Sequence, residues 1–179
     1  MERISADVRN KANKILLLLL DVDGVLTDGR IIIDDRGVET KHFHVRDGQG
    51  ISLLMRAGIE VGLITARSSH SVRHRAKELG LRLVRQGVRD KLAAYEEIKR
   101  GRDFRDSQIA YIGDDVLDLP ILRTVGFAVS VADGAADLRG AVDWVTAAAG
   151  GMGAVREVAE LLLKSQNKWR GLINELVKK

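Results

Sequence analysis

The chain has 179 residues, 45% of them hydrophobic, which predicts one domain over residues 1–179 with a sizeable core. It contains no cysteine, which excludes disulfides and thiolate metal sites and permits a reducing compartment, so we expect a cytoplasmic protein. The net charge of +4 is scattered and forms no basic block interleaved with aromatic residues, so we expect no nucleic-acid partner.

The first predicted element is a buried strand over the apolar run 15–20. This run is the longest in the chain and is far shorter than the ~20 residues of a membrane span, so we expect no membrane partner. Two β-rich runs follow at 30–34 and 38–45, separated by a polar, glycine-containing turn. They predict a β-hairpin flap over about 29–45 that projects over the edge of the sheet.

Beyond the flap, strand patterns alternate with helical patterns. Strands are expected at 60–64, 82–85, 108–112, 126–129 and 144–145. Helices are expected at 51–57, 69–79, 91–99, 117–123 and 135–139, and a final amphipathic helix begins at Ala154 in a C-terminal tail of about 150–179. This alternation predicts an α/β fold, a Rossmann-like parallel sheet with helices on both faces. The segments 22–64 and 92–113 are too short to add a cap domain.

Two carboxylates, Asp21 and Asp23, follow the first strand within the stretch DVDGVLTDG. Side chains alternate along a strand with a period of two, so both start on the same side. Ligands of open parallel sheets bind at the carboxyl ends of the strands, and Gly24 permits a sharp turn there. Taken alone, the stretch is equally consistent with a polar turn at a strand end.

Polar residues also stand at the ends of later strands. Thr65 closes the strand 60–64, Lys91 opens the helix after 82–85, and Asp114 follows the strand 108–112. In a parallel sheet these groups converge on one edge. Lys91 opposes the dipole at the start of its helix, and this local cost favours a functional role.

In chain order, the Asp-x-Asp loop at Asp21, the strand-end Thr65, Lys91 and the Gly-Asp-x-x-x-Asp turn at 113–118 resemble the four motifs of the haloacid dehalogenase superfamily. Four longer stretches carry a closer likeness within it: DVDGVLTDG (21–29), HVRDGQGI (44–51), YIGDDVLDLP (111–120) and GGMGAVREV (150–158). The likeness extends from Lys14 to about Lys164 and is nearest to the 3-deoxy-D-manno-octulosonate 8-phosphate phosphatase family of the capless branch. It implies a Mg²⁺-dependent phosphatase of that phosphorylated sugar acid, in lipopolysaccharide precursor synthesis, that works through an aspartyl phosphate. The alternatives are a phosphatase of a nonulosonic acid 9-phosphate and a non-catalytic oligomerisation module of the same fold, against which the intact motifs argue.

The resemblance also implies roles for individual residues. Asp21 is the expected nucleophile and Asp23 the general acid and base. Phosphate is expected on Thr65, Lys91 and Gly24. The expected Mg²⁺ ligands are Asp21, the backbone carbonyl of Asp23 and Asp114, which are hard oxygen donors, with Asp115 and Asp118 behind them. Helix capping explains Asp115 equally well.

Contacts to the sugar acid are expected from Asp23, His44, Val45, Arg46, Asp47, Gly48, Arg67, Arg75 and Lys91. Among these, an arginine is expected to bind the sugar carboxylate, because a planar guanidinium matches a carboxylate bidentately. Two residues depart from the family pattern: His44 stands where asparagine is common, and Ser52 stands where a basic residue is common. Both departures bear on which sugar acid is the substrate.

Without a cap, only the flap and a neighbouring subunit can cover the site. The flap carries Ile31, Ile33 and Phe43, which a lone hairpin would leave exposed. Because isolated hairpins are marginally stable in water, we expect copies of the flap to pair in a homotetramer.

Overall fold

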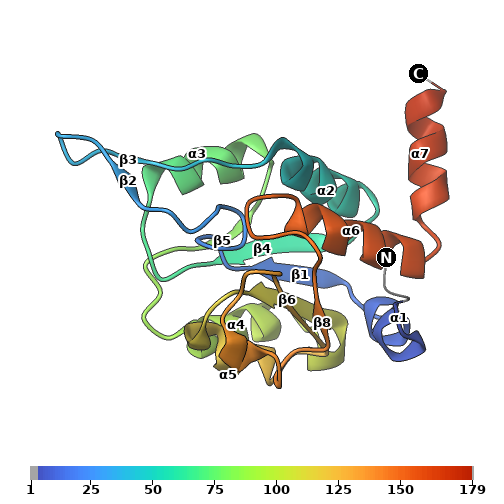
Figure 1. Cartoon of the computed structure of the whole chain (residues 1–179). Coiled ribbons are helices and arrows are strands. Elements are labelled where there is room, and N and C mark those ends of the chain that lie inside the picture. The colour runs from blue at the N-terminus through green and yellow to red at the C-terminus, as the bar shows by residue number, and fades with distance from the viewer. Residues whose placement is uncertain (1–3, 179) are drawn as a thin grey trace.

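The computed structural model describes residues 4–178, and its centre is a six-stranded parallel sheet between two layers of helices (Figure 1). From one edge to the other, the strands are β5 (Leu83–Arg85), β4 (Glu60–Ile64), β1 (Leu17–Leu20), β6 (Ile109–Gly113), β7 (Phe127–Ser130) and β8 (Trp144–Val145). Every neighbouring pair in this sheet is parallel. The predicted α/β fold is therefore confirmed.

Helices cover both faces of the sheet (Figure 1). On one face lie α2 (Val45–Arg56), α3 (His70–Glu78) and α6 (Ala154–Ser165). On the other lie α4 (Lys91–Arg102) and α5 (Leu119–Leu122). Three short 3₁₀ turns, Asp106–Gln108, Val116–Asp118 and Ala136–Leu138, complete the connections. None of the helices described in residues 4–178 has the length and apolar character needed to cross a membrane.

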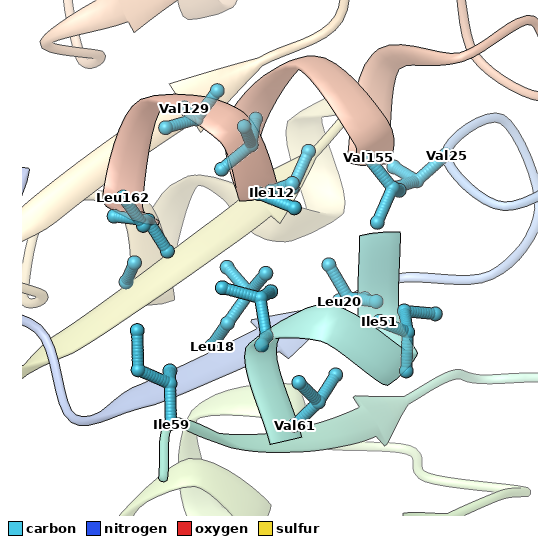
Figure 2. Packing of buried hydrophobic residues seen from close by; sticks show 14 of the residues in the cluster. Leu18, Leu20, Val25, Ile51, Ile59, Val61, Ile112, Val129, Val155 and Leu162 are labelled. Atoms are coloured by element: carbon cyan, nitrogen blue, oxygen red, sulfur yellow. The ribbon is translucent and has the colours of Figure 1, made fainter. Parts of the chain in front are cut away.

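The central strand β1 is apolar on both of its faces. Leu18 and Leu20 belong to the core beneath α2 and α6, as Figure 2 shows, whereas Leu17 and Leu19 belong to the core beneath α4 and α5. A strand covered on both sides is expected to be a continuous hydrophobic run rather than an alternating one. Burial on both faces fixes β1, and with it the position of Asp21 directly after its last residue.

The strands of the flap are shorter than predicted. Its strands are β2 (Ile32–Ile33) and β3 (Glu39–Thr40), which pair antiparallel and apart from the main sheet. The predicted strand 38–45 is too long: β3 ends at Thr40, residues 41–44 have no regular structure, and α2 begins at Val45. Ile31 and Ile33 are 59% and 57% exposed, whereas Phe43 is partly buried against the main core. The apolar residues that one chain leaves uncovered therefore lie toward the tip.

Helix α2 begins six residues earlier than the predicted helix 51–57, so that prediction was wrong at its start. The glycines of this segment argue against a helix by propensity, but packing overrides them. A Cβ on Gly50 would lie 3.1 Å from the Cα of Arg156 and 3.2 Å from the Cβ of Ala159, both in α6. Glycine therefore permits the close crossing of α2 and α6.

Two terminal helices were not predicted. Helix α1 (Ala6–Ala12) starts where the Ser5 hydroxyl accepts the backbone N–H of Val8 at 3.2 Å, and it buries Val8 and Ala12. Helix α7 (Trp169–Val177) follows α6, and Trp169 packs against the main core. The predicted helix 117–123 is instead a 3₁₀ turn followed by the four-residue α5.

The α2–α6 crossing gives a stability prediction. Gly50→Leu should lower the free energy of unfolding by about 1 to 3 kcal/mol, because the added side chain has no room against α6. The matched control is Gly101→Leu in α4, where a Cβ would meet nothing within 4 Å. That change should be neutral or stabilising, since it removes the helix cost of glycine. Urea unfolding of the two variants measures the difference, and equal losses would contradict the packing role of Gly50.

Candidate active site

A cavity of about 290 Å³ opens at the carboxyl ends of β1, β4 and β6. Its walls contain seven of the predicted site residues, together with Gly29, Ala66 and Leu117. The seven are Asp21, Asp23, Thr65, Arg67, Lys91, Asp114 and Asp115. The strand-end residues therefore do meet at one edge of the sheet.

Asp21 is buried and is held by the strand and by Lys91. Its backbone N–H continues the β1–β6 ladder to the carbonyl of Ile112 at 3.0 Å, and its Oδ1 accepts the N–H of Val22 at 2.7 Å. Lys91 Nζ donates to Oδ2 at 2.7 Å. Burial raises the pKa of Asp21 to about 6, against the opposing effect of the Lys91 charge.

Lys91 occupies the first position of α4, which is fixed by the Asp90 cap: Asp90 Oδ1 accepts the N–H of Ala93 at 2.9 Å. The ammonium donates to Asp21 and, also at 2.7 Å, to Asp118 Oδ1. Burial alone lowers the pKa of Lys91, but these two carboxylates raise it above its ordinary value. The site thus has a permanent positive charge beside Asp21.

Asp118 organises the groups around it. Its Oδ1 accepts Lys91 and also the hydroxyl of Tyr111 at 2.6 Å, and its Oδ2 accepts the backbone N–H groups of Asp114 and Asp115 at 3.0 and 3.3 Å. With both oxygens engaged, this fully buried carboxylate holds Lys91 and the 114–115 loop together. Tyr111 was not among the predicted site residues, although its position in strand 108–112, three residues before Asp114, was a usable signal.

Asp114 has the features of a cation ligand. Oxygens of Asp21, Asp114 and Asp118 lie within 4.8 Å of one another, and Asp114 Oδ1 is buried without a hydrogen-bond partner. Gly24 leaves room for this carboxylate: its φ is +86°, and a Cβ would come within 2.0 Å of Asp114 Oδ2. An unpartnered carboxylate oxygen among hard oxygen donors fits Mg²⁺, which Asp21 and Asp114 can hold.

Asp23 lies one pleat beyond Asp21 and contacts the flap. Its Oδ1 pairs with Lys41 Nζ, and its Oδ2 lies 3.8 Å from Arg67 Nε. Arg67 donates to Glu39 at 2.7 Å, and this bond is the main reason that the pKa of Glu39 falls to about 2. Lys41 and Glu39 were not predicted; their spacing of two residues in a β-rich run was the available signal, because it places both on one side.

Thr65 is buried at the end of β4, and its Oγ1 accepts the backbone N–H of Arg67 at 3.3 Å. The threonine hydroxyl keeps its own proton to donate to an anion. Asp115 is exposed, and its Oδ1 accepts the N–H of Val116 at 2.7 Å, so its capping contact is present.

The segment 44–48 is absent from the residues that line this cavity. Asp47 is buried and accepts the N–H groups of Arg156 at 2.8 Å and Gly153 at 3.2 Å, so it caps the start of α6. His44 Nδ1 lies 4.0 Å from Asp47 Oδ2, and Val45 is 80% exposed.

Two of the predicted arginines also lie elsewhere. Arg46 and Arg75 line a separate hollow of about 480 Å³, together with Gly48 and Ser52. Arg75 pairs with Glu78 at 2.9 Å and stands 5.9 Å from the centre of the Phe43 ring. Of the three candidate arginines, Arg67 is the one that lines the Asp21 cavity.

The crowding of carboxylates predicts a pH-dependent stability. Burial, with the nearby Asp21 charge, raises the pKa of Asp114 from 3.8 to about 7, so the folded protein keeps a proton that the unfolded chain releases near pH 4. Metal-free protein should therefore lose stability as the pH rises from about 4 to 7.

The substitution Asp114→Asn should raise the melting temperature of the metal-free protein at pH 8 and remove most of the stabilisation by Mg²⁺. Calorimetry at pH 5 and pH 8, with Mg²⁺ or EDTA, tests this; equal Mg²⁺ stabilisation of both proteins would refute it.

Comparison with known proteins identifies the family. No family model matches the chain. It is 46% identical to the 3-deoxy-D-manno-octulosonate 8-phosphate phosphatase of Escherichia coli K12 over 165 residues, 92% of this chain and 88% of the relative. The crystal structure of the Yersinia pestis phosphatase superimposes with a TM-score of 0.93 at 43% identity, covering 94% of this chain and 91% of that one.

A phosphatase of the same name from Moraxella catarrhalis, solved with magnesium, phosphate and the sugar acid, superimposes with a TM-score of 0.94. It is 44% identical, and the match covers 97% of this chain and 99% of that one. A hydrolase structure from Legionella pneumophila described as a member of the haloacid dehalogenase (HAD) superfamily also matches, with a TM-score of 0.93 at 43% identity. The chain belongs to the 3-deoxy-D-manno-octulosonate 8-phosphate phosphatase family of the haloacid dehalogenase superfamily.

Proposed function

We propose that this protein is a Mg²⁺-dependent phosphatase that hydrolyses 3-deoxy-D-manno-octulosonate 8-phosphate to the free sugar acid and phosphate, a step of lipopolysaccharide precursor synthesis. The observation that carries the proposal is the meeting of Asp21, Asp23, Thr65, Lys91 and Asp114 in one cavity. The Moraxella relative supports the substrate, since its structure holds magnesium, phosphate and the sugar acid. The whole chain acts as one phosphatase domain, and we assign it to the cytoplasm.

The reaction proceeds in two steps. A carboxylate oxygen of Asp21 bonds to phosphorus while the bond to the sugar oxygen breaks, and Asp23 gives that oxygen its proton. Water then bonds to the phosphorus of the aspartyl phosphate, gives a proton to Asp23, and releases Asp21. Bound Mg²⁺ would neutralise phosphate charge beside Asp21 and Asp114.

The phosphoryl oxygens are bound by Lys91, Thr65 and the backbone at Gly24. Lys91 is suited to this role because its buried ammonium already lies against Asp21, where negative charge spreads in the transition state. Its partner Asp118 sets the direction of the ammonium rather than meeting the substrate.

The sugar carboxylate is bound by Arg67, whose side chain is 45% exposed at the mouth of the cavity. Arg46, Arg75 and the segment 44–48 line no part of this cavity, so a role for them in substrate binding requires a neighbouring copy of the chain. Ser52 lies in the hollow with Arg75, so its departure from the family pattern concerns that second surface.

A catalytic test uses Asp21→Asn. This variant should fold but lose on the order of a thousandfold or more in kcat, because an amide is a poor nucleophile. Phosphate release is measured from 3-deoxy-D-manno-octulosonate 8-phosphate, a nonulosonic acid 9-phosphate and p-nitrophenyl phosphate, with Mg²⁺ or EDTA. The octulosonate ester should have a higher kcat/KM than p-nitrophenyl phosphate, because only the sugar acid has a carboxylate for Arg67 to bind in the transition state. Preference for the 9-phosphate would replace the proposed substrate, and a fully active Asp21→Asn variant would reject the mechanism.

The protein assembles as a homotetramer through its flap. Ile31, Ile33 and Val38 are each more than half exposed in one chain, and contact with other copies would bury them.

A double variant tests the assembly. Ile31→Asp with Ile33→Asp should convert the tetramer to smaller species, because charge is costly in an apolar interface. Val177→Asp is the control, since Val177 is 80% exposed on α7, away from the flap. Sedimentation velocity gives the mass. A wild-type monomer that is fully active at the assay concentration would overturn the assembly.

A further inference from the structure

Lys41, directly after β3 at the base of the flap, belongs to none of the catalytic motifs described above. Its side chain is 1% exposed, and its ammonium pairs with Asp23 Oδ1 and lies 3.3 Å from Glu39 Oε1. A buried ammonium requires compensating charge, and these two carboxylates provide it. Lys41 is therefore fixed from both sides, and one of its two partners is the general acid and base of the proposed reaction.

The contact distinguishes the two oxygens of Asp23. Oδ1 is engaged by Lys41, whereas the nearest cation to Oδ2 is Arg67 Nε at 3.8 Å, beyond hydrogen-bond distance. Asp23 itself lines the reaction cavity. Oδ2 is thus the oxygen left to carry a proton, and the Lys41 bond restricts rotation of the carboxyl group.

We propose that Lys41 is a positioning residue that holds Asp23 by Oδ1, so that Oδ2 gives a proton to the leaving oxygen and later takes one from water. The inference rests on the proposed function of the site. In the first step, Asp23 Oδ2–H protonates the sugar oxygen as its bond to phosphorus breaks. In the second, Oδ2 accepts a proton from water as the water oxygen bonds to phosphorus and Asp21 leaves. The proton count is restored after each turnover.

The same contacts connect the acid–base group to the flap. Glu39, in β3, accepts Arg67 at 2.7 Å and lies beside Lys41. Lys41 and Glu39 are both flap residues, whereas Asp23 and Arg67 follow β1 and β4. Acid–base catalysis consequently depends on the base of the flap being docked against the ends of these strands.

The test compares Lys41→Met and Lys41→Arg with the control Lys77→Met, which removes the same charge from an exposed position on α3. Two esters separate the steps. A nitrophenolate leaves without a proton, whereas an alkoxide needs one, so p-nitrophenyl phosphate bypasses the first role of Asp23 but not the second. The alkyl ester is the octulosonate 8-phosphate or, if wild type rejects it, any alkyl phosphate that wild type hydrolyses.

Lys41→Met should lower kcat for the alkyl ester by about a hundredfold or more, the usual contribution of general acid–base catalysis. With p-nitrophenyl phosphate, Lys41→Met should release nitrophenolate fast in the first turnover and slowly in later turnovers. The amplitude of this burst should equal the number of active sites. Lys41→Arg should restore most of the alkyl activity, and Lys77→Met should behave as wild type.

A Lys41→Met variant that hydrolyses the alkyl ester at the wild-type rate would overturn the proposal. So would an equal loss in the first turnover of both esters, which is the signature of a general structural defect. If Lys41→Met does not fold, as judged by its melting curve, Lys41→Gln is subjected to the same comparison with the same criteria. If wild type does not hydrolyse the octulosonate ester but hydrolyses another alkyl phosphate, the proposed substrate is wrong. The role of Lys41 is then still tested by comparing that alkyl ester with the aryl ester.

Discussion

Three carboxyl groups packed at the end of a buried strand set the main physical constraint on this protein. Oxygens of Asp21, Asp114 and Asp118 lie within 4.8 Å of one another, and burial together with the neighbouring carboxylates raises the pKa of Asp21 and of Asp114. The cation that contacts this group is Lys91, which is shared between Asp21 and Asp118 at 2.7 Å. One ammonium cannot neutralise three carboxylates, and the remaining negative charge is what gives the site its affinity for Mg²⁺ and, with the metal present, for phosphate.

The scaffold is built to hold that charge in place. β1 is fixed by leucines that enter a different core on each face, so Asp21 cannot shift without disturbing both. Gly24 allows the backbone to pass against Asp114, and Gly151 ties the tail to the same loop through its N–H bond to the Val25 carbonyl at 2.9 Å. Rigid elements around a densely charged centre are what a preorganised catalytic site requires.

The sequence allowed the sheet and the strand-end groups to be predicted, because both follow from local patterns: apolar runs mark the buried strands, and the first polar residue after each run marks the ligand edge. It did not reveal what depends on contacts between distant segments. Asp47 matches a family motif, yet its oxygens cap α6, more than a hundred residues away in the chain. Lys41 and Glu39 look like ordinary flap residues until folding brings them to Asp23 and Arg67.

These distant contacts also account for how a capless chain can control water at its reaction centre. A cap domain would enclose the substrate as a separate body, whereas the element proposed to cover this site is a hairpin with two-residue strands that has little stability of its own. Its base is held by charge, through Lys41 on Asp23 and Arg67 on Glu39, and the exposed apolar residues toward its tip are those that the proposed assembly would bury. Because an ion pair needs a defined geometry whereas apolar contact does not, the polar base is suited to orient Asp23 in the proposed reaction, and the apolar tip is suited to the proposed contact between copies.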